Sequence, residues 1–198
     1  AAFLFPAAGI LVEKIFSMDA AWAFTVAALL WVYLGIQKGQ VTQDGLTGLN
    51  NRRRLDQYMW ELDERSGERE TCCYLLMDVN KFKKVNDTYG HVTGDEVLRL
   101  VAEQLKRTFG NMQAFLARYG GDEFVVIVKG KTQDEMDVII HQTQENVNAI
   151  AWGADTPWQL SISIGCAMRG EQGKQKSHEL LELADERMYR QKKGIQDR

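Results

Sequence analysis

Acidic residues stand at two places where the sequence predicts a strand to end. Asp78 closes a short apolar run, and Asp122 and Glu123 lie in the glycine-rich break between two further strand-like runs. If those strands pack side by side, the carboxylates meet at one end of a sheet and repel one another unless a cation joins them. Carboxylate oxygens suit Mg²⁺, which proteins commonly hold through one or two carboxylates together with substrate phosphates.

Glycines and lysines near these acids extend the pattern. Gly120 and Gly121 place no side chain beside the acids, so a bulky ligand can approach the backbone there. Lys83 and Lys84 follow Asp78 at a distance of about one helical turn, where they can meet phosphate oxygens. This spacing predicts phosphoryl or nucleotidyl transfer with bound metal. The alternative is that the acids are solvated turn residues and the lysines ordinary surface charge.

The elements that must position these residues follow from hydrophobic periodicity and turn signals. The pattern predicts helices at residues 52–65, 81–89, 95–109, 132–150 and 178–193, and strands at 71–77, 113–119, 123–129 and 158–168. Residues 41–51 read as a loop that caps the next helix, and residues 90–94 as a turn. Strands mixed with helices around a central hairpin predict an α/β sandwich with a mostly antiparallel sheet.

Composition sets wider limits. The chain has 198 residues, a net charge of −3, 45% hydrophobic and 26% charged residues. These values suit one globular domain with a short appendage, and they exclude a disordered chain, a collagen-like fibre and a disulfide-stapled mini-protein. The near-neutral charge also argues against a dedicated nucleic-acid binder. Cys72, Cys73 and Cys166 lie in apolar runs and are expected to be small core residues.

The first 40 residues differ from the rest, with only four charged side chains. Residues 20–36 carry no charge and no proline, and as a helix they would span about 25 Å. We therefore expect a transmembrane-type helix, preceded in residues 1–12 by the tail of another, so that residues 1–40 form a membrane segment and residues 41–198 a separate domain. The alternative is a pair of buried helices in a soluble protein. Lys38 and the arginines at 52–54 follow the helix, which predicts an inner-membrane location with the C-terminal domain in the cytoplasm.

The run 118–124, RYGGDEF, resembles the signature of the GGDEF family, the diguanylate cyclases. Four further segments match family segments in order: DGLTGLNNRR, LLMDVNKFKKVNDTYGHVTGDEVL, SISIG and ADERMYRQKK. Together they cover nearly all of residues 44–193, so the chain is identified as a member of this family. With the membrane segment expected at residues 1–40, it is identified as a membrane-anchored member. The resemblance implies an α/β fold with an antiparallel-rich central sheet flanked by helices, of ferredoxin-like or polymerase-palm-like type.

The resemblance also implies an activity. Members of the family join two GTP molecules into cyclic di-GMP, a bacterial second messenger, and release two pyrophosphates. Each domain holds one GTP, and a homodimer completes the site so that each 3′-hydroxyl attacks the α-phosphate of the other nucleotide. Mg²⁺ is the implied cofactor, with Mn²⁺ as an alternative.

Metal and catalytic roles carry over one residue at a time. Asp78 and the backbone carbonyl of Val79 match the family's metal ligands. Asp122 matches the residue that binds metal and acts as base for the 3′-hydroxyl. Glu123 is expected to assist the metal site, although neighbours on a strand point to opposite faces. Lys83 matches the lysine that stabilises charge developing on the phosphates.

Substrate-binding roles carry over in the same way. Asn86 and Asp95 match the residues that hydrogen-bond the guanine base, and Lys192 matches a lysine of the last helix that reaches the phosphates. His91 matches a further substrate-side position or satisfies a turn carbonyl, and Phe82 lines the pocket or packs in the core. The implied substrate-binding set is Phe82, Asn86, His91, Asp95, Gly120, Gly121 and Lys192.

Two departures from the family pattern stand out. Residues 111–114 replace the arginine-x-x-aspartate product-inhibition site, and both charged groups are missing. We therefore expect no feedback inhibition through that site. After Lys192 the chain reads Lys193, Gly194, Ile195, with a shortened gap before the glycine and no arginine after it. One phosphate contact is therefore in doubt, and Lys193 is a candidate substitute.

The leading hypothesis is an active cyclase. A catalytically silent domain that serves as a nucleotide receptor or dimerisation module is the runner-up, and the intact signature disfavours it. A cyclase with altered base choice ranks third, because Asp95 is present. The short segment 37–43 suggests direct coupling from the preceding helix to the domain, a hypothesis that stepwise lengthening of this segment would test.

Overall fold

The computed structural model describes residues 10, 14, 21–38, 42–65, 71–151, 159–170 and 176–196. The chain divides into two compact units, Ala1–Thr42 and Gln43–Arg198. Its elements are α2 (Ala21–Lys38), β1 (Asn50–Asn51), α3 (Arg52–Arg65), β2 (Cys72–Val79), α4 (Phe82–Phe109), β3 (Ala114–Arg118), β4 (Glu123–Lys129), α5 (Gln133–Asn148), β5 (Ile162–Met168) and α6 (Ser177–Gln196).

The helix expected at residues 20–36 is present in the first unit as α2. The expectation that it spans a membrane is not met. Among the described residues, no helix is both long and apolar enough to cross a membrane. Helix α2 has 18 residues and ends at Gln37 and Lys38. Trp22 and Leu29 of α2 are each 65% exposed. Apart from residue 10, the run 1–12 lies outside the described residues.

The second unit is built on a five-stranded sheet in the order β1-β3-β4-β2-β5. β2 runs antiparallel to both β4 and β5, and β3 runs antiparallel to β4. Only the two-residue strand β1 is parallel to its neighbour, β3. The expectation of an antiparallel-rich sheet within an α/β fold is thus confirmed, whereas β1 lies in a stretch expected to be loop.

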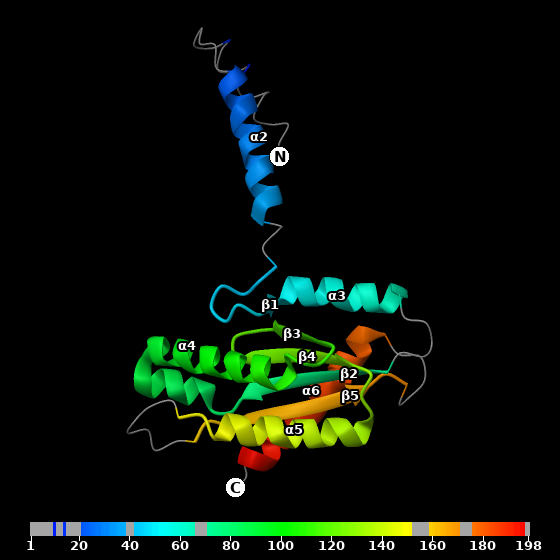
Figure 1. Cartoon of the computed structure of the whole chain (residues 1–198). Coiled ribbons are helices and arrows are strands. Elements are labelled where there is room, and N and C mark those ends of the chain that lie inside the picture. The colour runs from blue at the N-terminus through cyan, green and yellow to red at the C-terminus, as the bar shows by residue number, and fades with distance from the viewer. Residues whose placement is uncertain are drawn as a thin grey trace. The chain divides into compact units, whose positions relative to one another are not determined.

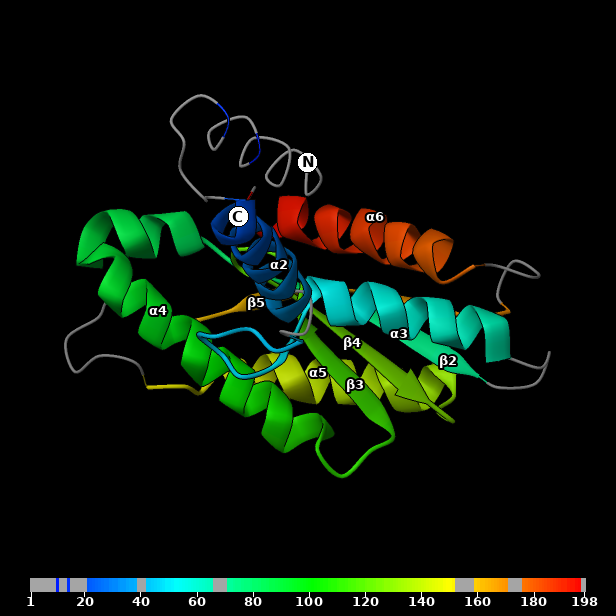
Figure 2. The same ribbon diagram turned by 90° about the horizontal axis from the view of Figure 1, so that it is seen from above.

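Helices cover both faces of this sheet (Figures 1 and 2). α4 and α5 bury Val97, Val101 and Met136 against one face. α3 and α6 lie side by side and bury Leu55 and Leu180 against the other. All eight residues of β2 are buried, which explains why its sequence reads as a continuous apolar run rather than an alternating one.

The two neighbouring cysteines of β2 lie in different cores, because successive residues of a strand point to opposite faces of the sheet. Cys72 lies in the core under α3 and α6, and Cys73 lies in the core under α4 and α5. Cys73 contacts Cys166 of β5 with the two sulfur atoms 2.9 Å apart. All three cysteines are buried and none of them forms a disulfide, so the expectation of small core residues is confirmed.

Helix α4 bends where the sequence predicts a turn. Gly90 has φ 83° and ψ 163°, a conformation that only glycine adopts readily, and it breaks the 28-residue helix into two segments. The expected turn at 90–94 is therefore a single residue, since the helix resumes directly after it. Figure 2 shows the resulting change of direction in α4. This bend matters for the site because candidate substrate residues lie on both sides of it.

Candidate active site

The register of the sheet places the predicted acids together. Asp78, near the end of β2, pairs directly with Glu123, the first residue of β4. Directly paired residues present their side chains on the same face, here the face covered by α6. The backbone N–H of Val79 donates to the carbonyl of Asp122 at 3.2 Å, which ties the signature turn to the end of β2. Asp78, Val79, Asp122 and Glu123 therefore form one cluster at one end of the sheet, the acidic end.

Electrostatics at the acidic end disfavour negative charge. Burial raises the pKa of Asp78, a hydrogen bond from Lys192 lowers it, and the nearby Asp122 carboxylate raises it, so that the pKa lies above its usual value. Burial and the carboxylates of Asp78, Asp122 and Asp185 also raise the pKa of Glu123. Such a cluster gains stability from any cation placed among its oxygens.

The ammonium group of Lys192 already lies at the acidic end. The Nζ atom of Lys192 on α6 is 2.6 Å from Oδ1 of Asp78, whose side chain is only 7% exposed. Among the described residues, no group of three or more His, Cys, Asp or Glu side chains is arranged to hold a metal ion. Two carboxylates with a backbone carbonyl nevertheless fit Mg²⁺, because this ion keeps part of its shell for water and phosphate oxygens. The donor set at the acidic end thus fits a metal that arrives with a nucleotide.

The signature turn is held by its own backbone and by Arg118. The N–H groups of Tyr119 and Gly120 donate to the carbonyl of Glu123 at 2.8 and 3.4 Å. Arg118 donates from Nε and Nη2 to the carbonyl of Gly121, at 3.1 and 2.7 Å. A Cβ at Gly120 would lie 2.7 Å from Oε2 of Glu123, whereas one at Gly121 would meet nothing within 4 Å. Of the two glycines, Gly121 therefore leaves the open approach, and Gly120 makes room for Glu123.

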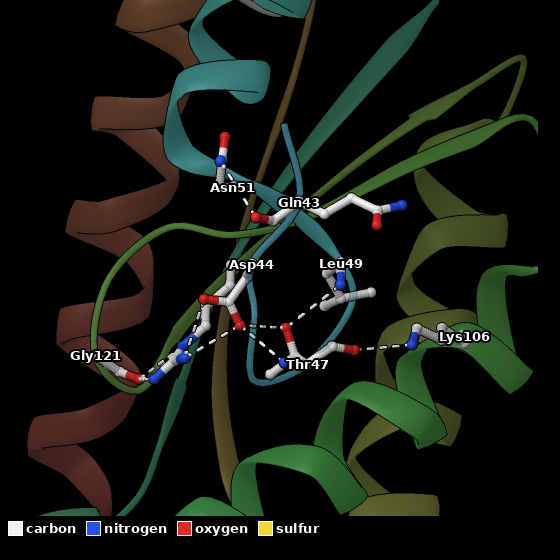
Figure 3. A network of polar contacts seen from close by, with 8 residues as sticks. Gln43, Asp44, Thr47, Leu49, Asn51, Lys106 and Gly121 are labelled. Carbon is white, nitrogen blue, oxygen red and sulfur yellow. Dashed lines mark hydrogen bonds and ion pairs between the residues drawn. The ribbon is translucent and has the colours of Figure 1, made fainter. Parts of the chain in front are cut away.

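Arg118 also joins the turn to the loop before α3 (Figure 3). Its Nη1 donates to both carboxylate oxygens of Asp44, at 3.1 and 3.2 Å. Asp44 also accepts hydrogen bonds from the N–H and hydroxyl of Thr47, whose carbonyl accepts from Lys106. Burial opposes the charge of Asp44, but the bonds from Thr47 and Arg118 outweigh it and lower the pKa of this carboxyl. The loop that the sequence marks as a helix cap is thus also a brace for the signature turn.

The bend in α4 brings a second group of predicted residues together. A Cβ at Gly94, beyond the bend, would collide with Oδ1 of Asn86 and lie 3.3 Å from the ring of Phe82. Oδ1 of Asn86 is buried, and no atom of the described residues forms a hydrogen bond with it. A buried acceptor without a partner is costly, so this oxygen suits a ligand with an N–H group. Asp95 follows Gly94 directly and is exposed.

The remaining predicted residues lie on α4 and α6. Lys83 and His91 are exposed on α4. Phe82 is half-buried and packs against the core under α4 and α5, so its packing role is confirmed. Lys193, the candidate substitute for a phosphate contact, lies over the ring of Tyr189 at 4.7 Å from its centroid.

Two supporting residues were not anticipated from the sequence. Arg118 stands beside the signature glycines, and that position was the only available signal. Asn80 follows Val79 and is held from two sides, because Nδ2 donates to Ser161 Oγ at 3.1 Å and Oδ1 accepts from Ser163 Oγ at 2.7 Å. Its partners are 81 and 83 residues away in sequence, so only the pairing of β2 with β5 reveals the contact.

Comparison with known proteins gives a consistent result. The family model described as "Diguanylate cyclase, GGDEF domain" matches residues 41–198. The chain is 32% identical over 160 residues to the probable diguanylate cyclase DgcC of Escherichia coli, covering 79% of this chain and 42% of that protein. It is 38% identical over 156 residues to the probable diguanylate cyclase DgcI of the same organism, covering 76% and 31%.

A solved structure agrees. The crystal structure of the GGDEF domain of DgcB from Caulobacter crescentus, in complex with c-di-GMP, is 31% identical with a TM-score of 0.69, and the match covers 78% of this chain and 92% of that one. The chain spans less than half the length of the curated relatives named above.

Proposed function

The chain belongs to the GGDEF-domain family of diguanylate cyclases, and on that basis we propose that residues 41–198 condense two GTP molecules into cyclic di-GMP and release two pyrophosphates. The observation that carries the proposal is the pairing of Asp78 with Glu123 beside Asp122, within an intact signature. Families that share a fold can differ in activity, so the proposal rests on this cluster rather than on the fold.

GGDEF diguanylate cyclases use a divalent metal, and we propose Mg²⁺, with Mn²⁺ as a substitute. Asp78, the Val79 carbonyl, Asp122 and Glu123 would hold it. A metal bound there polarises the phosphate oxygens and neutralises the charge that develops on them. The pKa values of Asp78 and Glu123 are raised in the metal-free site, and a cation bound among their oxygens would lower both.

The chain's own residues perform the remaining tasks. Asp122 would accept the proton of the 3′-hydroxyl that attacks the α-phosphate of the second nucleotide. Lys192, already at the acidic end, would meet phosphate oxygens, and Lys83 on the first turn of α4 would stabilise the charge that grows on the leaving pyrophosphate. Gly121 leaves the backbone open for the nucleotide.

Guanine selection would fall to the bend in α4. The partnerless Oδ1 of Asn86 can accept a hydrogen bond from a base N–H. A carboxylate such as Asp95 can accept two hydrogen bonds from the N1–H and N2–H edge of guanine, which adenine does not offer. Leaving these acceptors unpaired penalises the wrong base strongly. His91, exposed next to the bend, is proposed as a further substrate contact.

Catalysis would require two copies of the domain. In one copy the 3′-hydroxyl beside Asp122 has no α-phosphate to attack, since each domain holds a single nucleotide. We therefore propose a homodimer as the active species. Residues 111–114 carry neither charged group of a product-inhibition site, so no feedback inhibition is proposed through that surface.

Cellular location is a separate matter. We propose that the domain acts in the cytoplasm, where GTP is available. The membrane association expected from the composition of residues 1–40 remains a prediction. Fractionation of cells that make the protein would test it, and recovery only in the supernatant would contradict it.

The catalytic roles are tested by comparing Asp122→Asn with Asp137→Asn, an exposed control on α5. Both variants are incubated with GTP and Mg²⁺, and the products are separated by chromatography. We expect Asp122→Asn to lose at least about 100-fold in rate, the scale of a lost general base, and Asp137→Asn to retain the activity of the unmutated protein. Equal activity of the two variants would remove Asp122 from the mechanism.

A further inference from the structure

Among the described residues, strand β5 is the last strand of the sheet and pairs with β2 alone. No described strand bonds to its outward-facing backbone groups. Ile164 and Cys166 are both buried, at 6% and 9% exposure, so these groups need other partners.

Side chains from two helices supply those partners. Oε1 of Gln191 on α6 accepts a hydrogen bond from the N–H of Ile164 at 2.6 Å. Nη1 of Arg187, one helical turn earlier, donates to the carbonyl of Cys166 at 2.6 Å. Gln144 of α5 donates to the carbonyl of Ile162 at 3.3 Å. The backbones of Ile162, Ile164 and Cys166 therefore each form a hydrogen bond with a helix side chain along the outer edge of β5, and α6 supplies two of the three.

The backbone of α6 also lies unusually close to β5. A Cβ at Gly165 would collide with the carbonyl oxygen of Ala184 and the nitrogen of Met188. Arg187 and Gln191 are four residues apart and therefore lie on one face of the helix. Together with the close approach at Gly165, they fix both the height and the rotation of α6 against the strand.

Lys192 follows Gln191 directly, and its Nζ lies 2.6 Å from Oδ1 of Asp78. We propose that Gln191 is a positioning residue: with Arg187 it clamps the end of α6 to the edge of β5, and the clamp holds the Lys192 ammonium at the acidic end. The inference rests on the function proposed above, because it assigns a support to a residue of that same site.

The clamp matters because Lys192 is only four residues from the end of α6 at Gln196. The last carbonyls of a helix lack partners within the helix, and its end frays unless other contacts hold it. A shift of about 1 Å in a charged group at a reacting centre can change a rate about 100-fold. Gln191 keeps the last turns in place without touching the nucleotide itself.

The test uses Gln191→Leu, which removes the acceptor while keeping a side chain of similar size. We expect deuterium exchange at the Ile164 amide to become at least about tenfold faster. Affinity for α,β-methylene GTP with Mg²⁺, measured by calorimetry, should fall about tenfold. In a Lys192→Met background, Gln191→Leu should cause no further fall in affinity, because its effect passes through Lys192.

Two further variants complete the design. Gln191→Glu keeps an oxygen for the Ile164 N–H and should restore its protection from exchange. Arg190→Ala alters an exposed residue of the same turn, paired only with Glu186, and should change neither exchange nor affinity.

Several outcomes would overturn the clamp. A Gln191→Leu variant that is less thermostable yet binds the analogue as tightly as the unmutated protein would leave Gln191 a purely structural role. An equal further loss of affinity in the Lys192→Met background would show that it acts apart from Lys192. If the unmutated protein bound no analogue, the proposed function would fail. The clamp is refuted separately if deuterium exchange at the Ile164 and Lys192 amides is the same in Gln191→Leu as in the unmutated protein.

Discussion

Glu123 shows how a single residue can serve function at the expense of stability. Its carboxylate is partly buried and faces three other acids, which together raise its pKa. In the unfolded chain the carboxyl ionises near its ordinary value of 4.5. The folded protein therefore loses stability as the pH rises through the raised pKa.

We predict that Glu123→Gln raises the melting temperature of the metal-free protein at pH 7 by about 2–4 °C, while cyclase activity falls. The gain should vanish near pH 4, where the carboxyl is protonated in both states. Calorimetric melting across this pH range measures the effect. Glu64→Gln, at an exposed position of α3, is the control, and an equal gain there would contradict the account.

Asn86 and Gly94 illustrate how a missing side chain shapes a site. The space opposite Asn86 exists only because residue 94 has no Cβ. We predict that Gly94→Ala displaces Asn86 and Phe82 and lowers affinity for α,β-methylene GTP at least about tenfold. Gly194→Ala, where a Cβ meets nothing within 4 Å, should leave the affinity unchanged. Equal affinities of the two variants would place the base elsewhere.

At the scale of elements, the loop before α3 and the hairpin β3–β4 are joined by one ion pair. Arg118 and Asp44 are only 17% and 22% exposed in their side chains, so water screens the pair less than it does a surface pair. Arg118 also holds the Gly121 carbonyl, so a single side chain bonds both the loop and the signature turn.

This pair has a defined pH dependence. The folded-state pKa of Asp44 lies below its unfolded value of 3.8, so its stabilisation is complete above that value and is lost as the pH falls through the folded pKa. We predict that Asp44→Asn costs about 1 kcal/mol at pH 7. The difference in urea denaturation should shrink below pH 4, and Asp87→Asn, an exposed residue of α4, should cost nothing. A constant difference at all pH values would refute a charge-based role.

Much of the element order could be read from the sequence because each element has a clear local pattern. α3 and β4 begin and end at the predicted residues. The acidic end could be predicted too, since antiparallel pairing of neighbouring runs brings their ends together. Contacts with distant partners could not be predicted, such as Asn80 with Ser163 or Gln191 with Ile164. They depend on the order of strands in the sheet, which local periodicity does not encode.

The expected membrane helix is a feature that the sequence predicted and the structure does not contain among the described residues. Residues 20–36 were expected to span a membrane because the run carries no charge and no proline and is about 25 Å long as a helix. In the part of the chain that the structure describes, however, no helix is both long and apolar enough to cross a membrane.

At the scale of the whole molecule, the absent product-inhibition site makes a prediction about regulation. Asn111 is exposed, and Ala114 opens β3. We predict that cyclic di-GMP added to the unmutated protein does not lower its initial rate through this surface. Asn111→Arg combined with Ala114→Asp restores both charges and should create inhibition at micromolar product. If cyclic di-GMP inhibits the unmutated protein, and inhibits the Asn111→Ala and Ala114→Ser variants equally, another surface binds the inhibitor.

The central claim is that two copies of this domain make cyclic di-GMP from GTP. The most direct measurement is chromatographic analysis of the unmutated protein with GTP and Mg²⁺ over a range of protein concentrations. The account predicts one cyclic di-GMP and two pyrophosphates for every two GTP consumed, with a rate per domain that rises with concentration. GTP left intact at concentrations where the domains pair would contradict it and would favour a nucleotide receptor.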